Sequence, residues 1–185
     1  MGHICEWATE YIEYACGYEK TMEEIEEGTM STALGRTRAK VRNWTDEEIE
    51  GVFLGTDDLT VRNLFLFVKE SSYGGQVQSS EPKATATFNF YVRVRRPNGK
   101  PGPNVELQYR DGWESVRLFL NWTQYRVPES ALTAYRDDLK AVFGEAIEVS
   151  VPEPGVSLRA LGEKLEVFER VLLKFRDAID PGAGG

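Results

Sequence analysis

The strongest constraint on the fold is a strict alternation of apolar and polar residues between positions 84 and 95. The apolar members of the pattern are Ala84, Ala86, Phe88, Phe90, Val92 and Val94. The residues between them are Thr85, Thr87, Asn89, Tyr91, Arg93 and Arg95. Because successive side chains of a strand point to opposite faces of its sheet, this pattern predicts a β-strand with one buried and one polar face.

Two further alternating segments predict the rest of an antiparallel meander. Residues 105–110 and 115–123 alternate in the same way, which assigns Glu106 to the polar face, and an Asp-Gly pair between the segments is typical of a hairpin turn. The segment PNGKPGPN at 97–104 is rich in Gly and Pro, so we expect a turn that adds nothing to the strand ladder. A short further strand is expected at 146–151.

Two amphipathic segments can cover the apolar face of this meander. One begins at Pro128, which suits a first helical turn, and ends at Gly144. The other follows Ser157, a helix-capping residue, and is expected to run as one long helix to Ile179. The order β-β-β-α-β-α predicts an α+β domain with a three-stranded antiparallel meander, two packing helices and one further short strand.

The first 72 residues predict a helical lobe. An apolar stripe recurs at helical spacing up to Gly28, and its members are Trp7, Tyr11, Tyr14, Tyr18, Met22 and Ile25. Thr45 and Glu48 form a capping-box pattern before a short helix at 46–54, and a second helix at 59–71 is apolar nearly all round and expected to be buried. We therefore expect an acidic helical lobe at 1–72, a connector at 73–83, the α+β domain at 84–180 and a flexible tail at 181–185.

Charge is distributed unevenly along the chain. Of the 30 acids and 22 bases, residues 1–72 hold fifteen acids and seven bases, and the remaining residues hold fifteen of each, so the first part accounts for the net charge of −8. By contrast, residues 88–110 concentrate Arg and Lys around a single acid, Glu106. Charges farther apart than about 10 Å are largely screened at 0.1 M salt, so local patches matter more than the total.

The polar face of the predicted sheet is the candidate binding surface. With the adjoining loop, its members are Asn89, Tyr91, Arg93, Arg95, Arg96, Lys100, Gln108, Arg110, Arg117, Phe119 and Asn121. Three interpretations are open. The face can be merely solvated, or it can dock an acidic protein or the acidic helical half of the chain. It can also bind single-stranded nucleic acid, with bases stacked on Tyr91 and Phe119 and the arginines along the phosphates.

The residues that most catalytic and metal sites require are scarce. His3 is the only histidine and Cys5 and Cys16 are the only cysteines, which argues against Ser-His-Asp or Cys-His catalysis and against a zinc site. The glycine-rich loops that bind nucleotide phosphates are missing. We therefore expect no catalytic residues, no cofactor and no metal, although carboxylates beside Arg or Lys leave an enzyme possible.

The expected function is binding in the cytoplasm. No apolar run reaches the ~20 residues that a membrane helix needs, and the N-terminus lacks the pattern of a secretory signal, so no membrane association is expected. We interpret the chain as a regulatory or inhibitory module that binds a protein partner. The alternative is a single-stranded nucleic-acid-binding protein that uses the sheet face. The sequence leaves the partner and the oligomeric state open.

Overall fold

The computed structural model describes residues 40–78, 81–180 and 182 of the chain. In this part of the chain, one four-stranded antiparallel sheet has the strand order β1-β2-β3-β4. The strands are β1 (Thr87–Arg95), β2 (Pro101–Arg110), β3 (Ser115–Leu118) and β4 (Gly155–Ser157). Together with the helices described below, the sheet confirms the predicted α+β class.

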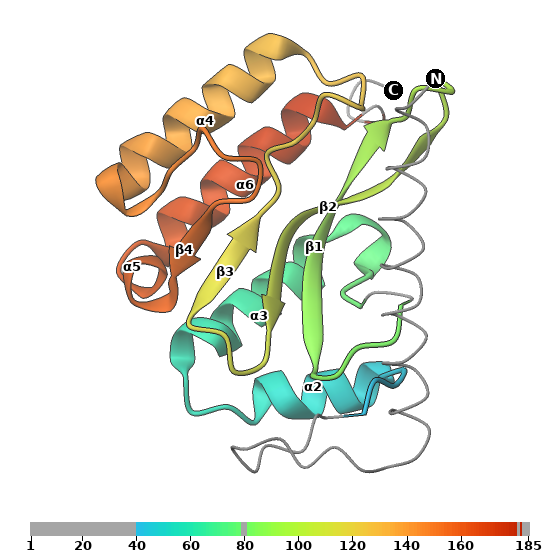
Figure 1. The fold of residues 1–185 in the computed structure, drawn as a ribbon, viewed down its shortest axis with the longest axis vertical. Coiled ribbons are helices and arrows are strands. Elements are labelled where there is room, and N and C mark those ends of the chain that lie inside the picture. Colours follow the sequence, from blue (N-terminus) through green and yellow to red (C-terminus); the bar gives the residue numbers. More distant parts are fainter. Residues whose placement is uncertain (1–39, 79–80, 181, 183–185) are drawn as a thin grey trace, which may run out of the picture. The chain divides into compact units, whose positions relative to one another are not determined.

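Helices cover one face of the sheet. They are α2 (Asp46–Leu54), α3 (Leu59–Ser71), α4 (Glu129–Phe143), α5 (Leu158–Gly162) and α6 (Leu165–Ile179), with 3-10 turns η1 (Tyr73–Gly75) and η2 (Gly144–Ala146). α3 and α6 contact β1, and α4 packs against α6. In Figure 1 the strands lie in front of α3 and α6, so the opposite face of the sheet is turned toward the viewer.

The buried residues form one hydrophobic core between the sheet and the helices. Phe88, Phe90, Val92 and Val94 are fully buried, as the alternation predicts. The ring of Phe53 in α2 lies 4.8 Å from that of Phe88, so α2 packs on the same core as the sheet.

Several predictions fall outside the described residues, among them the helical stripe ending at Gly28, both cysteines, His3 and most of the tail at 181–185. The division of the chain at 73–83 therefore stays a prediction, because most of the first lobe is not described. Within the described residues, no helix is both long and apolar enough to cross a bilayer.

The predicted helix starts of the first lobe are confirmed in detail. The Thr45 hydroxyl accepts a hydrogen bond from the Glu48 amide at 3.2 Å, while the Glu48 carboxylate accepts one from the Thr45 amide at 2.9 Å. Asp58 caps α3 through the amides of Thr60 and Val61. The prediction that α3 is buried holds for one face only, because Leu59 and Leu66 are exposed.

The expected turn at 97–104 is wrong in its second half. Pro101 and Pro103 belong to β2 and pair with Arg95 and Arg93. The β2–β3 pairing covers only Leu107 and Gln108, so no strand of the described residues flanks the proline end of β2 on its other side. Proline is tolerated at such an edge because the ladder needs no N–H there.

The last strand and the last helix also differ from prediction. The expected strand at 146–151 does not form, and β4 lies instead at Gly155–Ser157. The predicted strand 115–123 ends at Leu118. The expected single helix from 158 to 179 is two helices, α5 and α6. α5 ends at Gly162, where a Cβ atom would lie 2.6 Å from the Thr60 hydroxyl, so this glycine permits close packing on α3.

Candidate binding surface

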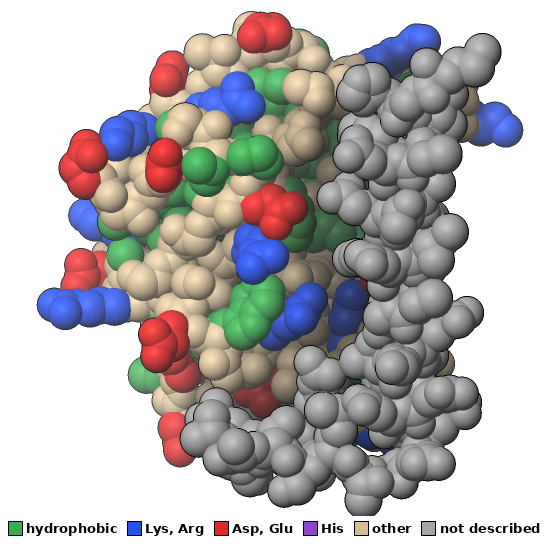
Figure 2. Space-filling view, viewed as in Figure 1, with side chains coloured by type: hydrophobic (Ala, Val, Ile, Leu, Met, Phe, Trp, Pro, Cys, Tyr) green, Lys and Arg blue, Asp and Glu red, His purple; other side chains and the backbone are tan. Residues whose placement is uncertain are grey.

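The sheet face turned away from the helices carries a row of polar side chains across three strands. Asn89 of β1 pairs with Gln108 of β2, which pairs in turn with Arg117 of β3. The residues on either side of them in their strands are buried in the core: Phe88, Phe90, Leu107, Tyr109, Val116 and Leu118. Basic, acidic and hydrophobic side chains adjoin one another over the strands on this face (Figure 2).

The candidates near the middle of β1 are bonded to one another. Asn89 is fully buried, accepts a hydrogen bond from the Gln108 amide at 2.9 Å and donates one to the Tyr91 hydroxyl at 3.2 Å. The Tyr91 hydroxyl donates to the carbonyl of Gln78 at 3.1 Å. Burial raises the pKa of Tyr91, so its hydroxyl stays protonated. The side chains of Asn89, Gln108 and Tyr91 are therefore bonded inside the protein, whereas Arg117 is exposed.

The segment before β1 closes the free edge of this strand. The amide of Asn89 donates to the carbonyl of Val77 at 2.7 Å, and the amide of Tyr91 donates to the Ser72 hydroxyl at 2.9 Å. An open strand edge exposes unpaired backbone groups to other chains, and a covering segment prevents this.

Arg93 is neutralised within the described fold. Its Nε donates to Asp180, the residue that follows α6, at 2.7 Å, and its guanidinium carbon lies 5.6 Å from the centroid of the Tyr73 ring. The pairing joins two residues 87 positions apart. The guanidinium of Arg93 therefore already has a carboxylate partner.

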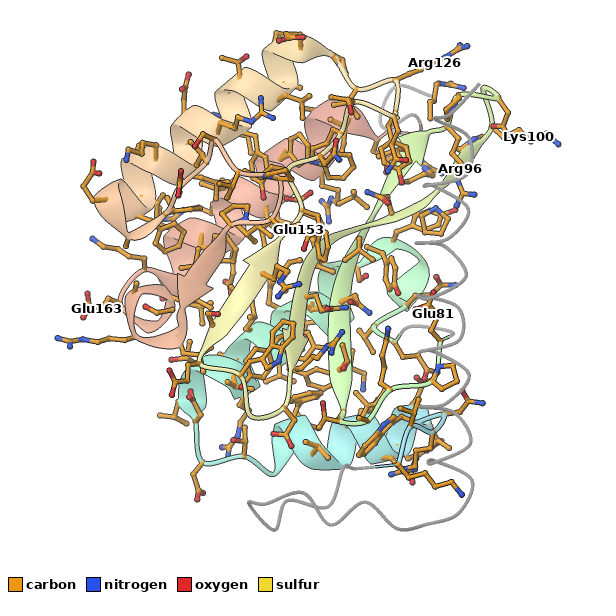
Figure 3. The ribbon with its side chains drawn as sticks, in the orientation of Figure 1. Glu81, Arg96, Lys100, Arg126, Glu153 and Glu163 are labelled. Carbon is orange, nitrogen blue, oxygen red and sulfur yellow. The ribbon has the colours of Figure 1, made fainter. Side chains whose placement is uncertain are left out.

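Four exposed cations meet at the tip of the β1–β2 hairpin, and we call them the hairpin cluster: Arg95, Arg96, Lys100 and Arg126. The guanidiniums of Arg95, Arg96 and Arg126 each donate to a backbone carbonyl, those of Gly99, Pro103 and Pro97, at 3.3 Å. None of the four cations forms an ion pair with another described residue. Figure 3 shows Arg96, Lys100 and Arg126 at the same end of the molecule.

Arg126 was not among the candidates predicted from the sequence. Its backbone amide donates to the carbonyl of Arg95 at 3.0 Å, which brings the segment after β3 beside the end of β1. No local pattern marks such a contact between distant segments.

A second basic group surrounds an indole at the other end of β2, and we call it the tryptophan cluster: Arg110, Trp113, Arg117 and Glu153. The guanidinium carbons of Arg110 and Arg117 lie 4.9 and 5.0 Å from the centroid of the Trp113 ring. Arg117 also pairs with the Glu153 carboxylate at 3.3 Å. Trp113 and Glu153 were not predicted, although Trp113 directly follows the predicted hairpin turn.

Phe119 and Asn121 lie beyond the end of β3, but the predicted alternation of burial continues there, because Leu120 and Trp122 are both buried. Phe119 is half-buried, and its amide donates to the carbonyl of Glu106 at 2.9 Å. Asn121 is exposed and accepts a hydrogen bond from the Thr123 hydroxyl. These two candidates therefore lie on the less buried side of the chain that continues β3.

The described residues contain no cluster that could hold a metal ion, and one of their grooves has a single carboxylate in its described lining. Among them, no three His, Cys, Asp or Glu side chains lie close enough to hold a metal ion. A groove of about 660 Å³ beside η1 is lined by Trp44, Asp46, Gln76, Gln78 and Tyr91, with Asp46 its single carboxylate among the described lining residues. A pair of groups for acid–base work would need a second.

The surface therefore consists of two basic groups separated by an internally bonded polar row. The hairpin cluster is free of acids, and the tryptophan cluster contains one. Comparison with protein-family models, with curated proteins and with solved structures finds no match for this chain.

Proposed function

We propose that this chain is a non-enzymatic binding module with a regulatory or inhibitory role, whose basic sheet surface binds an acidic segment of a partner protein. The observation that supports this most is the hairpin cluster. Its four cations have no ion pair with any described residue, although the chain as a whole carries a net charge of −8.

The hairpin cluster is suited to binding because each of its guanidiniums is bonded to a backbone carbonyl and still has N–H groups free to bind a ligand. An arginine has five N–H donors, and a single bond to a backbone carbonyl leaves most of them for a ligand. Charge complementarity of this kind speeds association and selects partners, more than it adds affinity. A regulatory module that meets its partner reversibly needs these properties.

An acidic peptide fits this surface better than a single-stranded nucleic acid. Binding of bases requires exposed aromatic rings on which they can stack. Tyr91 is partly buried and its hydroxyl is bonded to Gln78, while Phe119 is half-buried. Nucleic-acid binding is therefore kept as an outcome of the test.

The test is fluorescence anisotropy with the full chain and two labelled probes, a ten-residue Glu-rich peptide and a single-stranded RNA of ten nucleotides. The key variant replaces three exposed cations of the hairpin cluster, as Arg96→Gln, Lys100→Gln and Arg126→Gln. A control removes the same charge from α5, from the residue before α6 and from α6, as Arg159→Gln, Lys164→Gln and Arg170→Gln. We expect salt-sensitive peptide binding that weakens about tenfold in the hairpin variant and much less in the control.

Other outcomes would count against the proposal. Absence of peptide binding, or equal weakening in both variants, would overturn it. If the RNA binds more tightly than the peptide and the hairpin variant loses that binding, the nucleic-acid alternative replaces it.

A further inference from the structure

We propose that the tryptophan cluster is a subsite for one oxyanion of the bound peptide, a carboxylate or a phosphate, and that Glu153 is its intramolecular competitor. This inference rests on the proposed function, because it names how the same surface selects and regulates its ligand. The tryptophan cluster adds a second contact point for the peptide and contains an acid, Glu153, whereas the hairpin cluster contains none.

The backbone of the loop before β4 holds Glu153 over the sheet. The amide of Leu120 donates to the carbonyl of Pro152 at 2.7 Å, and the amide of Leu118 donates to the carbonyl of Pro154 at 3.0 Å. Glu153 lies between these two anchored prolines, in front of the strands in Figure 3. Its carboxylate is thereby kept within reach of Arg117 on the neighbouring strand.

The contact between Glu153 and Arg117 is of a kind that a ligand can displace. The two side chains are 48% and 46% exposed and approach to only 3.3 Å. Exposed ion pairs of this type are weak because water solvates both charges. A carboxylate or phosphate from a partner can therefore take the place of Glu153 without leaving a buried charge unpaired.

Arg110 supplies the charge that Glu153 does not neutralise. It has no carboxylate partner among the described residues, and its buried Nε has no hydrogen-bond acceptor there. Its guanidinium and that of Arg117 both rest against the Trp113 ring. A stacked guanidinium is restricted in orientation, which favours paired hydrogen bonds to the oxygens of a carboxylate or phosphate. Two cations with one acid leave this cluster able to accept a further anion.

The distance between the two clusters specifies the ligand. Pro101 and Arg110 mark the ends of β2, nine residue steps apart. At about 3.3 Å per residue this separation is on the order of 30 Å to Arg110 and about 23 Å to Arg117, which lies opposite Gln108. An extended peptide of about ten residues with acidic groups at both ends spans it. Engagement of both clusters makes the second contact intramolecular, so a peptide with one acidic end should bind more weakly.

The test uses the full chain and three labelled ten-residue peptides with the same Glu-rich first half. The second half of the peptide ends in Glu, in phosphoserine or in Gln. Glu153→Gln removes the competitor and Arg117→Gln removes a ligand contact. Glu163→Gln is the matched control, because this exposed acid lies well apart from Glu153 in Figure 3, pairs with Arg159, and its loss changes the net charge equally.

We expect Glu153→Gln to tighten binding of the Glu or phosphoserine peptide about threefold or more, while Glu163→Gln leaves it nearly unchanged. Arg117→Gln should weaken the same binding, and the Gln peptide should respond to neither substitution. The tighter of the first two peptides identifies the oxyanion.

Three results would overturn this inference, and they differ in what they imply for the proposed function. If Glu153→Gln and Glu163→Gln act alike, only total charge matters at this site. If the hairpin variant loses binding while Glu153→Gln and Arg117→Gln change nothing, the subsite fails and the proposed function stands. If no peptide binds to the wild type or to any variant, both fail. Thermal unfolding of each variant shows that the fold is retained.

Discussion

Tyr135 of α4 donates its hydroxyl hydrogen bond to Oε1 of Glu106 in β2, and both side chains are buried in the core. Glu106 points inward because the strand register moves from Phe90 opposite Leu107 to Tyr91 opposite Val105, which leaves Glu106 as the extra residue of a β-bulge. Burial raises the pKa of the Glu106 carboxyl well above its ordinary value. Burial therefore favours the neutral form of the Glu106 carboxyl up to a higher pH than in an exposed glutamate.

The first prediction concerns the pH dependence of stability. The pKa of Glu106 is higher in the folded protein than in the unfolded chain. Glu106 therefore contributes most to the free energy of unfolding below its unfolded pKa of about 4.3. The free energy of unfolding then falls by up to about 1.4 kcal/mol per pH unit until the folded pKa is reached. Glu106→Gln abolishes this loss, so the variant should gain stability relative to the wild type as the pH rises from 4 to 7. Urea unfolding at several pH values measures the difference.

The control for this experiment is an exposed acid outside the core. Glu163→Gln should change stability little, with no trend of the same sign across this pH range. A difference between Glu106→Gln and wild type that stays constant from pH 4 to 7 would show that Glu106 ionises normally in the folded state.

The second prediction isolates the Tyr135 hydroxyl. Tyr135→Phe keeps the ring that stacks on Phe175 at a centroid distance of 4.1 Å but removes the donor to Glu106. Oε2 of Glu106 has no partner among the described residues, so the variant leaves the whole carboxyl unbonded in the core. We expect a loss of about 1 to 3 kcal/mol in the free energy of unfolding.

A double variant distinguishes the missing bond from a packing defect. Glu106→Met combined with Tyr135→Phe replaces both polar partners by apolar groups, which is much less costly than removing one. The double variant should therefore be more stable than Tyr135→Phe alone. A loss in the double variant equal to or larger than that of the single would contradict this account.

The third prediction tests whether α2 and the sheet unfold together. The ring of Phe53 is fully buried and lies 5.4, 4.8 and 5.9 Å from the rings of Phe65, Phe88 and Tyr109. Phe53→Ala should cost about 3 to 5 kcal/mol, because it opens a cavity where α2, α3 and two strands meet.

Two probes of unfolding decide whether α2 and α3 unfold together with the sheet. If helical circular dichroism and tryptophan fluorescence give one shared transition in the wild type and in Phe53→Ala, α2 and α3 fold with the sheet. Separate transitions, with only the helical signal lost early in the variant, would favour the division at 73–83.

The sequence predicts those elements whose pattern is local. The alternation in β1 and the capping box at Thr45 depend on residues within a few positions, and both are confirmed. Glu106 shows the limit of this reasoning. Strict alternation assigns it to the polar face, but the bulge changes the side on which it points, and nothing in the neighbouring residues signals an extra residue in β2. The prolines of β2 led to a wrong prediction of a turn for a related reason. A strand tolerates proline where no neighbour needs its N–H, and here that depends on how far β3 extends along β2.

The sequence predicts that the candidate surface is basic, but it does not predict which of its cations are neutralised. The excess of basic residues is visible in the sequence, and the two clusters include four of the predicted arginines and Lys100. Which cations are neutralised depends on contacts between distant segments. The bond of Arg93 to Asp180 and the approach of Glu153 to Arg117 are both of this type. Side-chain pairing across the fold therefore decides where the surface is open to a ligand.

The last prediction concerns two glycines with opposite backbone requirements. Gly51 lies in the interior of α2 and is exposed, and a Cβ atom at this position would have no neighbouring atom within 4 Å, so Gly51→Ala should stabilise the protein by about 0.5 to 1 kcal/mol. Gly144 ends α4 with φ 57° and ψ −125°, a conformation that disfavours any side chain. Gly144→Ala should therefore destabilise the protein by about 1 to 3 kcal/mol, although a Cβ there would also meet open space. Urea unfolding of both variants and of their combination tests this, because distant substitutions add and the double variant should equal the sum of the two. If Gly144→Ala proved neutral, the turn after α4 would have a different backbone conformation from the one described.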